Sequence, residues 1–356
     1  MKTNKKGWAV EISKNYKHVT FVLYDSINNS VFHSQVLRPI LNFLESRPDA
    51  HVSLVSFEQS SIVSLGKFDT KKIIELVPAH DRLHFVLAKK LPFFGNPSLW
   101  PAVWQLKRLL RYLNPDHVVA RGPLAGWIAI KSRCDDLTVQ ARGLLAEEHR
   151  MVHKKKRRFI RSRYEKIEHE VYEPRGNVKI EAVSPALKAH LIKLYKTNPE
   201  RITIATHDIP DKYKKEQVAD WRKQMRSKLG LKDDYFVYCY NGSAHEWQCV
   251  DEMTDYFVEQ RKRNKKSFFL VLSKERDVFA QKFIGARVPK DSYKVLSVHP
   301  GQTQKYLSAA DAGLLFRKSD PVNWVARPTK VLEYEAVGLK VIHNNTVAWL
   351  TQESQK

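Results

Sequence analysis

Residues 317–342 read RKSDPVNWVARPTKVLEYEAVGLKVI, and the fold can be worked out from this stretch. Pro328 suits the first position of a helix, because a backbone N–H there would be unpaired in any case. Gly338 suits the residue after a helix, where the backbone turns left-handed. The pattern predicts a helix over residues 328–337 and a strand over residues 340–343. Repeated strand–helix units of this kind are typical of a parallel sheet covered by helices on both faces.

The start of this predicted helix could bind an anion. Free N–H groups in a first turn, together with the helix dipole, favour a phosphate. Thr329 and Lys330 lie in that turn, and Lys330 adds a positive charge. Glu333 lies three residues after Lys330 on the same helical face, where its carboxylate could accept hydrogen bonds from a ribose diol. An ordinary helix with a Lys–Glu pair has the same spacing, so spacing alone does not separate the two interpretations.

The alternation of strands and helices runs through the whole chain and begins twice. Short β-branched and aromatic runs, such as residues 18–24 (HVTFVLY) and 235–240 (YFVYCY), are typical of buried parallel strands. The pattern restarts after a boundary near residues 198–212. We therefore predict an α/β protein with two Rossmann-like domains facing a central cleft, over residues 1–205 and 206–356.

Serines mark the starts of two predicted helices in the first half. Ser34 is expected to cap a helix over residues 34–45, where apolar residues recur at helical spacing. Ser184 is expected to cap a helix that begins at Pro185 and ends near Tyr195.

Further polar residues follow predicted strands in the second half. Gly242 and Ser243 come after one strand, Lys274 after a second and His299 after a third. The carboxyl ends of parallel strands meet at the edge where open α/β sheets bind ligands, and glycine lets the backbone approach a ligand closely. We expect these loops to converge with the helix start at Lys330.

Composition limits the classes of partner. The 356 residues include 61 Lys+Arg and 38 Asp+Glu, a formal net charge of +23, so an anionic partner is expected. Cys134, Cys239 and Cys249 are too few and too scattered for a disulfide framework or a zinc site. No apolar run approaches the ~18 residues of a membrane helix. These features predict a cytoplasmic protein, with peripheral attachment to the inner face of the cytoplasmic membrane as an option.

Two segments would suit an anionic membrane surface. Residues 154–166 (KKKRRFIRSRYEK), from Lys154 to Lys166, hold eight basic residues and one acid. Residues 91–113, from Leu91 to Leu113, combine aromatic and basic side chains as interfacial helices do. These side chains are Phe93, Phe94, Trp100, Trp104, Lys107, Arg108 and Arg111. A solvated helix face and ordinary core aromatics are the alternatives.

Nucleic acid and metal are not expected partners. The sequence shows no zinc-finger spacing, no RNP-like strand and no basic-zipper heptads. A basic nucleic-acid-binding protein stays an alternative because of the net charge. No DxD-like pair follows a predicted strand, which predicts a site without metal.

The segment ARPTKVLEYEAVGLKVI (residues 326–342) resembles the PTK-x-x-EY-x-A-x-G-x-x-VI segment of GT-B glycosyltransferases similar to family 4. Residues 240–248 and 295–316 resemble that family's donor domain. Looser matches in the first half are Ser34-Gln35-Val36-Leu37, Arg142-Gly143 with Glu147-Glu148, and residues 182–191. The resemblance covers most of the chain from about His18.

The resemblance implies transfer of a sugar from a nucleotide-diphosphate donor to a glycan or lipid-linked acceptor, as in capsule or lipopolysaccharide synthesis. Retention at the anomeric carbon is implied, with no cofactor beyond the donor substrate. Glu333 would bind the donor ribose, and Thr329 and Lys330 the diphosphate. Gly242 and Ser243 would line the phosphate side, and His299 would face the base.

The resemblance also implies an acceptor side and catalytic groups. Arg121, Gly122, Arg142 and Gly143 would lie on the acceptor side, with Glu147 as general base. Lys274 and Lys330 would stabilise the leaving diphosphate, because cations aimed at developing charge act most strongly in the transition state.

The sequence departs from the family pattern in the donor domain. The glutamate often found eight residues before Glu333 is replaced by Val325, with Asp320 and Asn323 as candidates to substitute for it. Arg317 is a further candidate to neutralise phosphate. Without the carboxylate at Val325, a non-catalytic GT-B-fold subunit stays an alternative.

Overall fold

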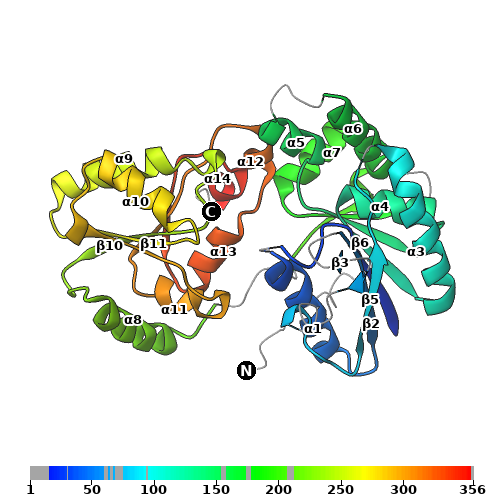
Figure 1. The fold of residues 1–356 in the computed structure, drawn as a ribbon, viewed down its shortest axis with the longest axis horizontal. Helices are drawn as coiled ribbons and strands as arrows, with labels where there is room; N and C mark the ends of the chain where they lie inside the picture. Colours follow the sequence, from blue (N-terminus) through cyan, green and yellow to red (C-terminus); the bar gives the residue numbers. More distant parts are fainter. Residues whose placement is uncertain are drawn as a thin grey trace. The chain divides into compact units, whose positions relative to one another are not determined.

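The computed structural model describes residues 16–29, 31–59, 63–64, 67–68, 75–93, 95–153, 158–173, 178–206 and 212–353. The chain forms two compact units, Met1–Asp208 and Ile209–Lys356, where the sequence prediction places the boundary after residue 205. Each unit is built on its own parallel sheet (Figure 1).

The N-terminal unit contains a seven-stranded parallel sheet with the order β5-β2-β1-β6-β7-β8-β9. Its strands are β1 (His18–Leu23), β2 (His51–Glu58), β5 (Leu83–Lys89), β6 (His117–Arg121), β7 (Leu137–Ala141), β8 (Lys179–Ala182) and β9 (Ile202–Ile204). In the central strand β1, Phe21 lies opposite Leu54 on one side and Val119 on the other. Strand β1 is buried from Val19 to Leu23, as expected for a strand covered on both faces.

Helices connect these strands. They are α1 (Arg38–Ser46), α3 (Trp100–Leu113), α4 (Gly122–Lys131), α5 (Leu145–His153), α6 (Arg158–Tyr172) and α7 (Pro185–Tyr195). Shorter turns are η2 (His33–Leu37), η3 (Asn96–Leu99) and η4 (Pro199–Arg201), and β3 (Val63–Ser64) pairs with β4 (Lys67–Phe68) as a small antiparallel ribbon.

The C-terminal unit contains a five-stranded parallel sheet with the order β12-β11-β10-β13-β14. Its strands are β10 (Phe236–Asn241), β11 (Ser267–Leu272), β12 (Tyr293–Leu296), β13 (Ala312–Leu315) and β14 (Lys340–His343). Its helices are α8 (Lys215–Leu229), α9 (Val250–Arg263), α10 (Arg276–Gly285), α11 (Thr303–Leu307), α12 (Pro321–Val325), α13 (Thr329–Ala336) and α14 (Ala348–Glu353), with η5 (Glu246–Gln248), η6 (Lys290–Ser292) and η7 (Pro300–Gln302).

Helices cover both faces of this second sheet. Figure 1 shows α9 and α10 on one face and α8 and α11 on the other. Alternate residues of β10 confirm this arrangement: Val237 and Cys239 pack with α8 and α11, while Tyr238 and Tyr240 pack with α9 and α10. The alternation follows from the two-residue repeat of a strand.

Both sheets reverse their strand order at one point. In the N-terminal unit, β2 and β5 are added on one side of β1, and β6 to β9 are added on its other side. In the C-terminal unit, β11 and β12 are added on one side of β10, and β13 and β14 on its other side. Open α/β sheets bind ligands outside the carboxyl ends of the strands at such a switch point. The topology therefore identifies one candidate ligand-binding location in each unit.

Two helix starts differ from the sequence prediction. Ser34 does not cap its helix: the helical segment begins at His33 as a π-helical turn, and Ser34 Oγ donates to Val31 O at 3.3 Å. Pro328 precedes α13 as its N-cap instead of occupying its first turn. The prediction for Ser184 is confirmed, because its Oγ accepts from the Leu187 N–H at 3.0 Å.

Close packing at Gly313 fixes α13 against β13. A Cβ at Gly313 would overlap the ring of Tyr334, which is fully buried. We expect Gly313→Ala to lower the free energy of unfolding by about 1–3 kcal/mol, because an added atom in a packed core forces its neighbours to shift. Urea unfolding measures the change. Gly285→Ala is the matched control, since a Cβ there has no atom within 4 Å, and an equal loss in both variants would contradict the prediction.

Candidate functional site

The switch point of the C-terminal unit brings together five residues from three elements. Strand β10 ends at Asn241 and is followed by Gly242, Arg317 follows β13, and Lys330 and Glu333 lie on α13. These residues are far apart in the sequence and meet only because β10 and β13 are neighbours in the sheet.

Glu333 is held by the end of β10. Asn241 Nδ2 donates to Glu333 Oε2 at 2.5 Å, and the backbone N–H of Asn241 donates to the hydroxyl of the adjacent Tyr334 at 3.1 Å. The Glu333 side chain is half-buried. Its carboxylate is therefore oriented by the protein and still partly open, as a group that binds a ligand's hydroxyls should be.

Lys330 lies buried beneath the loop after β10. Its Nζ donates to Gln248 Oε1 at 2.5 Å and to the Tyr240 hydroxyl at 3.1 Å, and lies 4.7 Å from the centre of the Tyr240 ring. A Cβ at Gly242 would overlap the Lys330 side chain, and the φ of Gly242 is +147°. Glycine is thus required at position 242 both for space and for its backbone conformation.

Arg317 lies close enough to affect Lys330 electrostatically. Burial lowers the pKa of Lys330 well below its ordinary value, and the positive charge of Arg317 lowers it further, while Glu333 opposes the shift. Burial likewise lowers the pKa of the Arg317 guanidinium. A buried ammonium and a half-buried guanidinium thus adjoin one half-buried carboxylate, an arrangement that a bound anion would stabilise.

The Arg317 guanidinium retains an unused donor. Its backbone is fixed by Asn344, which accepts from the Arg317 N–H at 3.2 Å and donates to the Arg317 carbonyl at 2.7 Å. Arg317 Nε is buried and has no hydrogen-bond partner within the described ranges of the chain. A phosphate oxygen would satisfy this donor, since Arg binds phosphate with charge-assisted hydrogen bonds.

The other predicted donor residues follow strands of the same sheet or begin α13, and in the described residues none of them hydrogen-bonds the side chain of Arg317 or Glu333. Ser243 is half-buried and its carbonyl accepts from the Tyr240 hydroxyl at 2.7 Å, and Thr329 is the first residue of α13. Lys274 follows β11 and is exposed. His299 follows β12 and is exposed, and its Nδ1 accepts from the Gly301 N–H at 3.2 Å.

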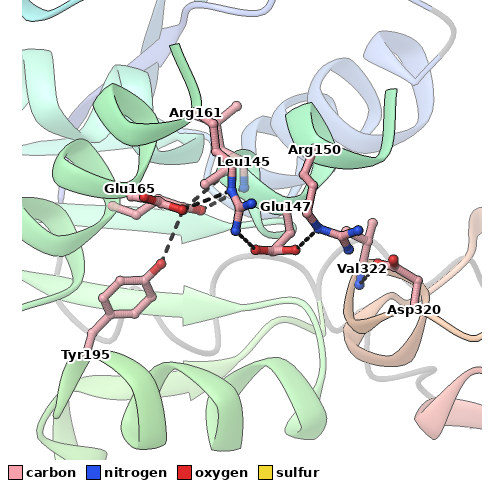
Figure 2. A network of polar contacts seen from close by, with 10 residues as sticks. Leu145, Glu147, Arg150, Arg161, Glu165, Tyr195, Asp320 and Val322 are labelled. Carbon is pink, nitrogen blue, oxygen red and sulfur yellow. Dashed lines mark hydrogen bonds and ion pairs between the residues drawn. The ribbon is translucent and has the colours of Figure 1, made fainter. Parts of the chain in front are cut away.

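A core residue, Val325, occupies the position where the family pattern often has a glutamate. Val325 is 1% exposed at the end of α12. Asp320 caps α12 by accepting from the Val322 N–H at 3.0 Å, as Figure 2 shows. Asn323 is buried and donates to the Lys318 carbonyl at 2.9 Å. Both substitutes considered from the sequence therefore have structural contacts of their own.

The predicted acceptor residues lie at the carboxyl edge of the N-terminal sheet. Arg121, the last residue of β6, is 4% exposed and donates to Gln35 Oε1 at 2.5 Å. Gly122 follows with a φ of +76°. Arg142 lies 3.5 Å from Glu181, and a Cβ at Gly143 would overlap the carboxylate of Glu148.

Glu147 lies between two arginines. Its carboxylate forms ion pairs with Arg150 and, at 2.9 Å, with Arg161, as Figure 2 shows. Arg161 also pairs with Glu165 at 3.0 Å. These contacts tie α5 to α6, and the role of Glu147 as general base stays a prediction.

A buried carboxylate that the sequence did not single out caps α5. Glu168 accepts from the backbone N–H groups of Leu145 at 2.7 Å and Ala146 at 3.3 Å, and from the Tyr195 hydroxyl at 3.2 Å. Its neighbours Ile167 and Val171 on α6 are fully buried, and this apolar face is the only signal that the sequence carries for its burial. Burial raises the pKa of Glu168 to about 7.

Comparisons with known proteins place the architecture. No family model matches the chain, and no curated protein matches it. The structure of WaaG, a glycosyltransferase involved in lipopolysaccharide biosynthesis, is similar at a TM-score of 0.62 with 18% identity, over 95% of this chain and 84% of WaaG. Sucrose-phosphate synthase from Thermosynechococcus elongatus is similar at a TM-score of 0.64 with 13% identity, over 93% of this chain and 82% of the synthase. The chain has the GT-B fold.

The GT-B fold confirms the resemblance to GT-B glycosyltransferases and the α/β fold class, while membership of family 4 stays a prediction. UDP-GlcNAc 2-epimerase from Neisseria meningitidis, solved with UDP-GlcNAc bound, is also similar, at a TM-score of 0.53 with 11% identity, over 92% of this chain and 82% of the epimerase. The fold therefore does not by itself fix the reaction.

Within the residues that the structure describes, no group of three or more His, Cys, Asp or Glu side chains could hold a metal ion. No helix in the same residues is long and apolar enough to cross a membrane.

The raised pKa of Glu168 predicts a pH-dependent stability. A carboxyl whose pKa rises from 4.5 to about 7 on folding favours the folded state at low pH, and this contribution is lost as the pH rises through 7. We expect the free energy of unfolding to fall between pH 5 and pH 8, by about 1.4 kcal/mol per unit of pKa shift. Urea unfolding at several pH values measures this dependence. Glu168→Gln should make the free energy of unfolding less dependent on pH, whereas Glu200→Gln, at an exposed position, should not. An equal pH dependence in the wild type and both variants would refute the prediction.

Proposed function

We propose that this protein transfers a sugar from a nucleotide-diphosphate donor to a glycan or lipid-linked acceptor. The observation that supports this most is the unused Nε donor of Arg317 beside buried Lys330 and oriented Glu333, at the switch point of a GT-B donor-type sheet. An anion with an attached diol is the ligand that these groups suit.

The donor would bind across the start of α13. The diphosphate accepts from Arg317 and from the free N–H groups of the first turn at Thr329, while the ribose hydroxyls donate to Glu333. The ammonium of Lys330 lies behind Gly242 and compensates the phosphate charge from inside the unit.

The same cations would assist the reaction. As the bond between the sugar and the diphosphate breaks, negative charge grows on the leaving group, and Arg317 and Lys330 stabilise that charge more than they stabilise the ground state. With charge compensation supplied by side chains, we propose a metal-independent reaction without a further cofactor. Retention at the anomeric carbon is the outcome that the family resemblance implies.

We propose that the protein is cytoplasmic and binds an anionic membrane surface, where it meets its acceptor. Trp100 and Trp104 on α3 are 53% and 65% exposed, and Phe159 on α6 is 60% exposed. The rings of Phe93 and Tyr164 are stacked with their centres 4.6 Å apart, and this contact links the segment before α3 to α6.

Basic side chains accompany these aromatics. In the described residues of the two segments the exposed ones are Arg108 and Arg111 on α3 and Arg158 and Lys166 on α6. Phe94 and residues 154–157 of the basic segment lie outside the described ranges. Aromatic rings with adjacent cations suit the headgroup region of an anionic bilayer. We therefore propose a lipid-linked surface glycan as the acceptor class.

The donor site predicts binding of a free nucleoside diphosphate. We expect UDP or GDP to raise the melting temperature, and Arg317→Met and Lys330→Met each to weaken binding at least tenfold, because a hydrogen bond to a charged group contributes about 1.5–3 kcal/mol. Isothermal titration measures the affinity. Lys223→Met, at an exposed lysine of α8, is the control and should bind as the wild type does.

The outcomes separate the candidate functions. Binding without turnover on any donor would favour a non-catalytic subunit, and interconversion of two nucleotide sugars without transfer would favour an epimerase. Failure of every nucleotide, together with salt-dependent binding of DNA or RNA that survives Glu333→Ala, would favour a nucleic-acid-binding protein.

The aromatic surface predicts membrane binding that depends on tryptophan. We expect the double variant Trp100→Ala/Trp104→Ala to bind vesicles of phosphatidylglycerol and phosphatidylcholine several-fold more weakly in a sedimentation assay, because two large side chains no longer enter the interface. Trp324→Ala is the control, since Trp324 is 47% exposed on the other unit. An equal loss of vesicle binding in both variants would contradict a membrane-binding role for the exposed aromatic side chains of α3.

A further inference from the structure

A basic cavity lies beside α8 in the C-terminal unit. Its volume is about 440 Å³, and it is lined by residues of α8 and of the loop that joins α8 to β10. Four basic residues and one acidic residue line it: Arg222, Lys223, Arg226, Lys232 and Asp233. Pockets for small molecules have volumes of about 300–1,000 Å³. The size of this cavity therefore suits a small molecule, and its charge favours an anion.

The cavity is separate from the candidate donor site. It adjoins the loop that leads into the amino end of β10, whereas Gly242 and Arg317 follow the carboxyl ends of β10 and β13. Strand β10 has six residues, and a strand rises about 3.3 Å per residue, so its two ends are roughly 20 Å apart. A ligand in this cavity would leave the Arg317 and Lys330 groups of the same unit accessible.

Arg222 presents an oriented and unused donor in the wall of the cavity. Its Nη1 donates to the Ala310 carbonyl at 2.5 Å, and its Nη2 donates to Asp311 Oδ1 at 2.6 Å. The side chain is 35% exposed, and Nε forms no hydrogen bond with any residue that the structure describes. The contacts to Ala310 and Asp311 fix the guanidinium in advance, so less side-chain entropy is lost when Nε binds a ligand.

Arg226 lies behind Arg222 and is almost fully buried. Its side chain is 4% exposed and donates to the carbonyls of Ala309 at 3.0 Å and Tyr235 at 2.6 Å. Its Nε is buried without a hydrogen-bond partner in the described part of the chain. Asp311 is the carboxylate that both guanidiniums share, with Arg226 Nη1 at 3.6 Å from Oδ2. One carboxylate does not balance two guanidiniums, and a bound anion would compensate the excess positive charge.

Two ammonium groups add to this excess. Lys223 and Lys232 are exposed, and no carboxylate of the described ranges forms an ion pair with either of them. Asp233 is the acidic residue of the lining and is also exposed. Exposed lysines alone are typical of a solvated helix face. Here they adjoin two fixed guanidiniums with unused donors, and this combination indicates a binding site.

We propose that this cavity binds a small phosphate monoester, in a site that is independent of the proposed glycosyl transfer. A phosphate monoester carries a charge of about −1.5 to −2 at pH 7 and has three strong acceptor oxygens. It therefore matches a cluster of two guanidiniums and two ammoniums better than a singly charged carboxylate does. Guanidiniums bind phosphate oxygens through charge-assisted hydrogen bonds, and lysines contribute point charges.

The test is isothermal titration of the full chain with glycerol 3-phosphate, with glycerol as the uncharged control ligand. We expect Lys223→Met/Lys232→Met to bind glycerol 3-phosphate about fivefold more weakly, because an exposed ion pair contributes roughly a two- to threefold change in affinity. Lys214→Met/Lys215→Met removes the same charge at exposed positions at the other end of α8 and should bind as the wild type does.

Further measurements locate the ligand. Glycerol 3-phosphate should slow hydrogen exchange in residues 219–233, and Arg317→Met should bind it with wild-type affinity. The Lys223→Met/Lys232→Met variant should keep the wild-type affinity for UDP or GDP. Vesicles that contain phosphatidic acid present the same chemical group on a lipid. Lysine-dependent binding of these vesicles without binding of glycerol 3-phosphate would assign the site to a lipid headgroup that bears a phosphate monoester.

Three results would overturn the proposal. They are the absence of binding to both glycerol 3-phosphate and phosphatidic acid, an equal loss of affinity in the two double-lysine variants, and loss of binding in Arg317→Met. Binding of duplex DNA at the same lysines without binding of either monoester would also overturn it. Failure of every nucleotide sugar as a donor would contradict the proposed function and leave this site unaffected, since the titration requires no turnover.

Discussion

The burial of the Lys330 ammonium beneath the backbone of Gly242 is the constraint on which the candidate site depends. It requires glycine at the end of β10, acceptors from Tyr240 and Gln248, and a position for α13 that also brings Glu333 to Asn241. An ammonium buried next to a guanidinium destabilises the unliganded protein locally. A site built in this way gains electrostatic stability when an anion enters it.

The two units apply the same topological rule to different chemistry. In the C-terminal unit the switch point between β10 and β13 presents cations with one carboxylate, which suits a diphosphate and its ribose. In the N-terminal unit the switch point between β1 and β6 presents the half-exposed carboxylate of Asp25 at 3.8 Å from the buried guanidinium of Arg121.

Val325 stands where the family pattern often has a glutamate. Val325 is packed into the core, and the nearby Asp320 and Asn323 are used to cap and brace α12. All three residues are therefore committed to the packing and capping of α12.

Hydrophobic period, glycine and proline act locally, so the sequence predicted the α/β fold class, the strands near residues 18–24, 235–240 and 340–343, and the helix that carries Lys330 and Glu333. It did not determine which partners the charged groups would find. Glu147 and Glu148 are neighbours in the chain, yet it is Glu147 that forms ion pairs with Arg150 and Arg161. Lys330 reaches the Tyr240 hydroxyl and Glu333 accepts from Asn241 because β10 and β13 lie side by side. The contacts of Lys330 with Tyr240 and of Glu333 with Asn241 join residues 90 and 92 positions apart, and only the packed tertiary structure brings them within reach.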